Sequence, residues 1–198
     1  MDTGVGTAQE SPERRLRADA RRNAARVLEA AREVFAELGS EASLEEIARR
    51  AGVGIGTLYR HFPTRDALVE AVFRDTVDAS CSRGEELLVS DDPTSALTAW
   101  LREQMRQSSV CRGLAAEAMI MMLDEQGCGA SNACDALHDI GARLLRRAQE
   151  SGAVRADTEI DDLIRLVNAI GFATEGAPDR ERQSDRLFDL MMEGLRSS

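Results

Sequence analysis

The residues best suited to bind phosphate lie in one short stretch, GVGIGTLYRHFPTRDAL at 52–68. Three glycines alternate there with aliphatic residues, and hydroxyl, aromatic and basic side chains follow at Thr57, Tyr59, Arg60 and His61. Such a stretch could be a glycine-rich loop that binds a nucleotide, or a tight turn that leads into a helix whose side chains contact nucleic acid. The two alternatives require different glycine spacings and different preceding elements.

A nucleotide-binding loop is excluded by register and by context. The dinucleotide fingerprint G-x-G-x-x-G would place its third glycine at Tyr59 if it began at Gly54, or at Thr57 if it began at Gly52. A Walker A loop needs a Lys, and the sequence contains none. The run before Gly52, SLEEIARRA, is helical rather than strand-like.

A helix-turn-helix fits the same stretch. We expect helices over about 21–38, 44–51 and 55–61. Ser43 and Glu46 form a capping box at the start of the second helix, and Gly52 can end it in the left-handed conformation. The expected inner face consists of Ile47, Ala48, Ala51, Val53, Leu58 and Phe62. The polar and basic residues of the third helix are then left outside, where they suit a major groove.

The stretch from about Val27 to Val72 resembles the DNA-binding domain of the TetR family of transcriptional regulators. The similarity is carried by ARRAGVGIGTLYRHFPTRDAL, in which the matching residues are Ala48, Ala51, Gly52, Val53, Gly56, Thr57, Leu58, Tyr59, His61, Phe62 and Leu68. Two positions depart from the family pattern. Gly54 stands where a capping Ser is common, at a cost of only a few tenths of a kcal/mol, and Arg65 replaces the usual Lys.

Residue chemistry and the resemblance together assign roles at the DNA. We expect Tyr59, His61 and Arg65 to contact phosphates, together with the backbone N–H of Ser43. The candidates for base edges are Ile55, Gly56, Thr57 and Arg60. The alternatives are that Tyr59 packs against the protein and that His61 caps the C-terminus of its helix.

Composition and charge divide the chain into three segments. Residues 1–20 are polar and without periodicity, and we expect a disordered arm, with the Arg cluster Arg14–Arg22 crowding its end. Residues 21–66 are the expected DNA-binding domain, and residues 67–198 an effector-binding and dimerisation domain. The net charge is −10, but residues 1–65 carry +1 and residues 66–198 carry −11, so the acidity lies behind the expected DNA-binding part. The Arg cluster either contacts DNA or is a solvated tail.

The rear segment is expected to be helical throughout, which gives an all-α fold with about nine helices. The expected helices cover about 64–82, 93–108, 112–125, 132–151, 158–175 and 179–195. The last two are apolar on more than one face, which predicts a twofold dimer through a four-helix bundle. Its interface is expected to contain Leu163, Val167, Ile170, Leu187, Met191 and Leu195. The alternative is that the core of a single chain covers both faces.

Two further sets of rear residues have chemistry of interest. The resemblance implies a ligand pocket, and flexible or aromatic apolar side chains suit its lining. The candidates are Trp100, Met105, Met119, Met122 and Phe172, with ordinary core packing as the alternative. The spacing C-x5-C-x3-H at Cys128, Cys134 and His138 could bind metal or sense oxidant, but such isolated clusters are usually coincidental, and we expect no metal site.

The sequence also disfavours several functional classes. No apolar run approaches the roughly 20 residues that span a membrane, and no secretory signal is recognisable, so we expect a cytoplasmic protein without a membrane partner. No nucleophile, base and acid form a recognisable set, so neither an enzyme nor a cofactor is expected. The function that fits best is a transcriptional repressor that binds a palindromic double-stranded operator as a homodimer and is released by a small-molecule effector. A DNA-binding module without an effector is the other alternative.

Overall fold

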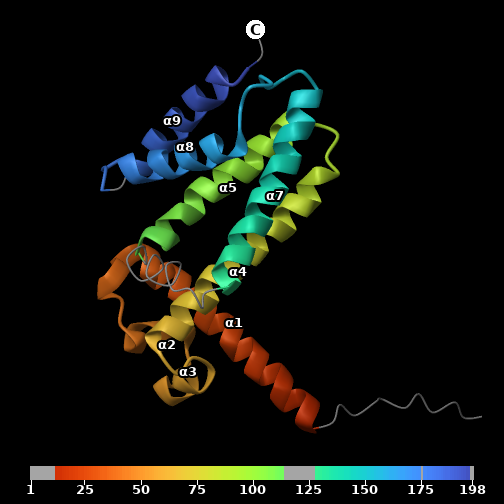
Figure 1. Cartoon of the computed structure of the whole chain (residues 1–198). Helices are drawn as coiled ribbons and strands as arrows, with labels where there is room; N and C mark the ends of the chain where they lie inside the picture. The colour runs from red at the N-terminus through yellow and green to blue at the C-terminus, as the bar shows by residue number, and fades with distance from the viewer. Residues whose placement is uncertain (1–11, 114–127, 175, 197–198) are drawn as a thin grey trace, which may run out of the picture.

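The computed structural model describes residues 12–113, 128–174 and 176–196. These residues form eight α-helices and one short 3-10 helix, with no strand among them (Figure 1). The prediction of an all-helical fold is confirmed. The helix expected over 112–125, with Met119 and Met122, lies almost entirely outside the described residues.

The first helix, α1 (Pro12–Leu38), begins well before the expected start near Arg21. Pro12 occupies the first helical position, where its missing N–H costs nothing, and the Arg, Ala and Leu residues that follow are good helix formers. The expectation of a disordered arm is therefore wrong for residues 12–20. These residues lack hydrophobic periodicity, and in Figure 1 this part of α1 extends from the lower end of the molecule.

The lower part of the molecule is a helical unit with its own core. It contains α1, η1 (Gly39–Glu41), α2 (Leu44–Ala51), α3 (Ile55–His61) and the first turns of α4 (Arg65–Leu88). The expected bounds of α2 and α3 are confirmed. The buried core residues all come from the interval 27–72: Val27, Ala30, Ala31, Val34, Phe35, Ala42, Ile47, Ala48, Ala51, Leu58, Phe62, Leu68, Val69 and Val72.

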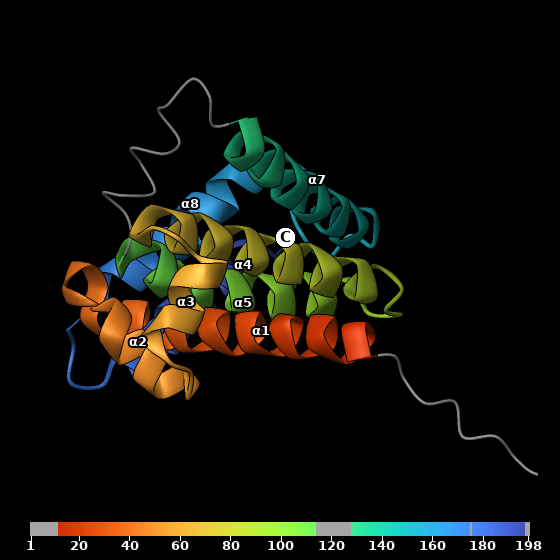
Figure 2. The same ribbon diagram turned by 90° about the horizontal axis from the view of Figure 1, so that it is seen from below.

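The fourth helix belongs to both halves of the molecule. Thr64 caps its start by accepting a hydrogen bond from the backbone N–H of Ala67 at 3.0 Å, as the sequence predicts. Its first turns bury Leu68 and Val72 in the lower core, whereas later residues pack against α5 (Pro93–Gly113) and α7 (Cys128–Glu150). A continuous helix therefore links the two cores, and it lies beside both α5 and α7 (Figure 2).

The upper core is built around Trp100, which is completely buried. Its indole Nε1–H donates to the Ser80 carbonyl of α4 at 3.2 Å. Two glycines make room for the ring and its neighbours: a Cβ at Gly141 would lie 2.7 Å from Trp100 Cη2, and a Cβ at Gly84 would collide with Ile140. The helices α4, α5 and α7 approach closely because these positions carry no side chain.

The last two helices, α8 (Ile160–Ala173) and α9 (Arg180–Gly194), form the upper end in Figure 1. Arg102 of α5 holds α9 in place, since its guanidinium donates to Asp185 at 2.6 Å and to Asp189 at 2.7 Å and lies 4.6 Å from the centre of the Phe188 ring. Within the described part of the chain, no helix is long and apolar enough to cross a membrane.

Candidate nucleic-acid interface

The turn between α2 and α3 is set by two glycines. Gly52 has φ 63°, in the left-handed region, and its N–H donates to the carbonyls at the end of α2. Gly54 is the N-cap of α3 in an extended conformation and provides no side-chain cap. Both glycine roles match the sequence prediction, and together they fold α3 back across α2 within three residues.

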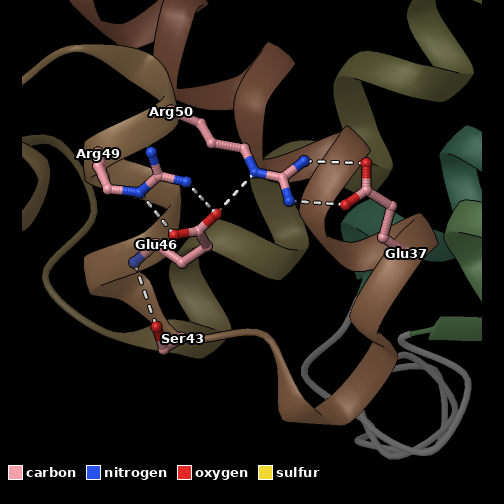
Figure 3. Close-up of polar contacts among 5 residues, drawn as sticks. All are labelled: Glu37, Ser43, Glu46, Arg49 and Arg50. Carbon is pink, nitrogen blue, oxygen red and sulfur yellow. Dashed lines mark hydrogen bonds and ion pairs between the residues drawn. The ribbon is translucent and has the colours of Figure 1, made fainter.

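The start of α2 is held by the Ser43 half of the predicted capping box and by a larger ionic network (Figure 3). Ser43 Oγ accepts from the Glu46 N–H at 3.1 Å. The Glu46 carboxylate in turn accepts from Arg49 Nε at 2.8 Å and from Arg50 Nε at 2.8 Å. Arg50 also donates to both oxygens of Glu37 on α1, at 2.9 and 2.6 Å. The network therefore joins α2 to α1 by hydrogen bonds between exposed side chains.

We predict that the Glu46 part of this network weakens in acid. Hydrogen bonds from Arg49 and Arg50 lower the pKa of Glu46 from 4.5 to about 2. Because the folded pKa is the lower one, its stabilising effect is fully present above pH 4.5 and is lost as the pH falls towards 2. The melting temperature of wild type should fall more steeply over this range than that of Glu46→Gln. Parallel melting curves for the two proteins would contradict the prediction.

The outward face of α3 gathers most of the predicted DNA contacts. Tyr59 is 46% exposed and Ile55 is 38% exposed, so neither side chain is buried in the core of the unit. Arg60 is exposed and lies 3.4 Å from the Thr57 hydroxyl, measured from Nη2 to Oγ1. A Cβ on Gly56 would meet nothing within 4 Å. Leu58 is fully buried on the opposite face, so the helix presents one polar and one apolar side.

Two residues predicted to contact phosphate, Arg65 and His61, contact other parts of the protein in the structure. The guanidinium of Arg65 lies 5.2 Å from the centre of the Phe35 ring and donates to the Ala42 carbonyl, so it holds the start of α4 against α1. Arg65 thus has a role within the fold, and its contact with a DNA phosphate stays a prediction. His61 is half-buried beside Phe62, with ring centroids 6.2 Å apart.

Sequence reasoning missed two side-chain contacts that join α1 to α2 and to the turn after it. Arg26 of α1 donates from Nη2 to the Gly52 carbonyl at 3.3 Å, and so supports the turn itself. Arg50 reaches Glu37 in the same way. Neither pair has a local spacing signal, because both join residues 13 or more positions apart.

The predicted pocket residues do not form one group. Trp100 and Met105 are buried in the upper core, at 0% and 5% exposure, whereas Phe172 is 70% exposed on α8. Phe172 is therefore a surface residue rather than part of a pocket lining. Met105 also borders a hollow of about 310 Å³ between α5, α8 and α9, together with Gly171, Thr174 and Ser184. Met119 and Met122 lie outside the described residues.

Some of the residues predicted for a dimer interface are buried in the core of the chain, and others are partly or largely exposed. Leu163 and Val167 are fully buried and Leu195 is 9% exposed, all within the core of this chain. Leu163 and Val167 have no exposed surface to offer to a partner, which corrects their assignment, and Leu195 has little. Ile170 and Met191 are partly buried against the same core. Leu187 is 39% exposed. Other apolar residues are exposed on this helix pair: Leu166, Phe172 and Leu190.

Of the Cys and His residues at the start of α7, the structure describes the side chains of Cys134 and His138. Cys134 is exposed as a residue, but its sulfur is partly desolvated. This desolvation and the Asp135 charge raise the pKa of its thiol. The His138 ring lies 3.3 Å from Asp161 of α8. Groups that could hold a metal ion are absent from the described residues, which do not include the Cys128 side chain.

Comparison with known proteins matches both halves of the chain. Residues 27–72 match the family described as bacterial regulatory proteins, tetR family. Residues 92–197 match the transcriptional regulator SbtR-like C-terminal domain. The curated regulator UidR of Escherichia coli K12 is 25% identical over 157 residues, which cover 77% of this chain and 79% of UidR.

Two crystal structures are similar over most of their length. The TetR transcriptional regulator SCO0520 of Streptomyces coelicolor is 35% identical with a TM-score of 0.75, and the match covers 88% of this chain and 99% of that one. A TetR regulatory protein of Mycobacterium vanbaalenii is 38% identical with a TM-score of 0.71, over 91% and 99% of the two chains. The family and the fold are those of transcriptional regulators and not of enzymes. This chain belongs to the TetR family of DNA-binding transcriptional regulators.

Proposed function

We propose that this regulator is a repressor that binds a palindromic operator as a homodimer and leaves it when a small molecule binds the upper helices. The observation that carries the DNA-binding part is the outward face of α3. The seven-residue helix α3 exposes Tyr59, Ile55 and Arg60. Gly56 lies among them and adds no side chain to this face. Such a helix fits a major groove.

The dimer is supported by exposed apolar side chains at the upper end. Leu166 is 45% exposed, Leu190 is 55% exposed and Phe172 is 70% exposed, and all lie on α8 or α9. Large apolar side chains that stay exposed on two neighbouring helices favour an interface there, and a twofold axis at these helices would form a four-helix bundle. The two copies of α3 would then meet successive major grooves about 34 Å apart.

Release by a ligand is supported by the way α4 joins the two cores. A ligand that shifts α5 or α7 also shifts α4, because Trp100 is hydrogen-bonded to α4 at Ser80. The N-terminal end of α4 carries Leu68 and Val72 of the lower core, so α3 moves with it. The ligand thus favours a spacing of the α3 helices that does not fit DNA. A neighbour with the same fold and 22% identity, LfrR of Mycobacterium smegmatis, is known in complex with proflavine.

A gel-shift assay on the DNA upstream of the chain's own gene tests the proposal. We expect a retarded band at low salt, a footprint with two symmetric halves, and twice the monomer mass by light scattering. The absence of a retarded band would contradict DNA binding at this site. A monomer that binds a single half-site would contradict the dimer alone.

The first turns of α1 add a second expected contact with DNA. Arg14, Arg17 and Arg21 are exposed and share one helix face, because their spacings are three and seven residues. They extend from the same end of the molecule that carries α3 (Figure 1). Each Arg that contacts a phosphate releases counterions.

We predict that the double variant Arg17→Ala/Arg21→Ala has a smaller salt dependence of operator binding. The slope of log K against log salt should fall by about 0.9 for each lost phosphate contact. A matched control, Arg83→Ala/Arg165→Ala, removes the same charge from exposed sites on α4 and α8. Equal slopes for the two double variants would show that the Arg cluster is only a solvated part of the helix.

A further inference from the structure

The upper core contains a buried amide that donates to nothing. Gln104 of α5 is 9% exposed, and its Nε2 has no hydrogen-bond partner. The other polar residues that are buried in the described parts of the chain are bonded: Thr76 to Val72, Ser80 to Gln107, and Thr174 to Ile170. One other buried donor atom lacks a partner, Arg32 Nε of α1, but the same guanidinium is paired with Glu29 and Asp75 through its other nitrogens. An unpaired buried amide destabilises a protein, so its presence calls for a physical reason.

The amide faces the interior of the helical bundle. Leu97, Trp100 and Leu101 precede Gln104 by seven, four and three residues, and all three are completely buried. Residues at these spacings lie on one face of a helix. That face packs towards α4 and α7, because Trp100 contacts Ser80 and the Gly141 position. Gln104 therefore places an unused donor on an otherwise apolar face.

We propose that Gln104 is the hydrogen-bond donor for the effector, which is an uncharged, mostly apolar molecule with an accepting oxygen such as a carbonyl. The proposal rests on the effector-responsive function above and names the chemical class of the effector. The apolar neighbours of Gln104 supply the contact area, and its two N–H groups supply a single polar point of recognition.

The absence of nearby buried charge argues for a neutral ligand. The buried polar residues in the described parts of the upper core are hydroxyls and this amide, and none of them is ionised. A charged ligand would lose its hydration there without a charged partner, which is strongly unfavourable. A ketone or ester oxygen loses far less and gains the Gln104 hydrogen bond.

The first test measures stability without any ligand. Gln104→Met keeps the length of the side chain and removes the unpaired amide, so the melting temperature should rise by about 2–8 °C. Gln107→Met is the matched control on the same helix. Its amide accepts from Ser80 at 2.5 Å and donates to Glu103 at 2.9 Å, so this variant should melt lower than wild type. A lower melting temperature for Gln104→Met would mean that the amide is bonded within the fold and would overturn the proposal.

The second test uses three probes that share a chain of the same length and differ in charge: 2-undecanone, undecanoate and undecylamine. Trp100, the only Trp of the chain, lies one turn from Gln104 and reports binding by its fluorescence. The ketone should bind wild type more tightly than either charged probe. Its affinity should fall about fivefold in Gln104→Met, as expected for one neutral hydrogen bond, and remain unchanged in Gln107→Met.

Failure of this proposal is distinct from failure of the repressor function. Undetectable ketone binding, a preference for a charged probe, or equal ketone affinity in wild type and Gln104→Met would each overturn the role of Gln104. Operator binding without probe should be the same in all three proteins, and its absence in wild type would instead contradict the proposed function.

Discussion

Replacement of Tyr59 by Ala should reduce operator affinity by at least about 100-fold, because a hydrogen bond to a charged group is lost in each half of a dimer. Tyr59 is 46% exposed on the outward face of α3. Removal of its ring should therefore leave the fold intact. A gel shift or fluorescence anisotropy titration at fixed salt measures the change, and the melting temperature should stay within about 2 °C of wild type because surface substitutions rarely change stability by more than 0.5 kcal/mol.

Two controls separate the hydroxyl from the ring of Tyr59. Tyr59→Phe retains the aromatic surface but lacks the phenol O–H, so if that O–H binds phosphate it should lose most of the affinity that Tyr59→Ala loses. Val89→Ala, at a position that is 84% exposed between α4 and α5, should bind as wild type does. Unchanged affinity in Tyr59→Ala would mean that this face of α3 does not meet DNA.

Replacement of Trp100 by Ala should lower the free energy of unfolding by about 3–5 kcal/mol. The side chain is fully buried between α4, α5 and α7. Its removal leaves a cavity that the surrounding helices cannot close, and it also deletes the hydrogen bond to the Ser80 carbonyl. Urea denaturation followed by circular dichroism measures the loss, since the variant has no Trp fluorescence.

Trp100→Phe provides the graded comparison. It should lose less stability than Trp100→Ala, because much of the ring volume is retained. A loss below about 1 kcal/mol in Trp100→Ala would show that the ring contributes little to the packing of the upper core, since burial is the source of the larger cost.

Much of the lower unit could be predicted because its signals are local. Ser43 with Glu46 fixed the start of α2, Gly52 fixed its end, and Thr64 fixed the start of α4. Each signal joins residues within a few positions, where chain geometry leaves one favourable arrangement. The outward direction of Tyr59 followed as well, because Leu58 and Phe62 must face the core.

The predictions for the upper helices were weaker because apolar residues cover more than one face of α8. Periodicity identified the helix but did not determine which face packs against α5. Packing places Leu163 and Val167 in the core of this chain and leaves Leu166 and Phe172 exposed. The rotation of a helix about its own axis is fixed by its neighbours, and a sequence pattern with two apolar faces allows both outcomes.

The sequence by itself determined the family, the helical fold and the turn GVGIG that presents α3, because these depend on residue types at short, fixed spacings. Tertiary structure decided which side chains are free to act. It placed the Arg65 guanidinium over Phe35, joined Arg50 to Glu37 and enclosed the Gln104 amide without a partner. Burial and pairing depend on residues distant in the chain, so only the packed arrangement of helices could settle them.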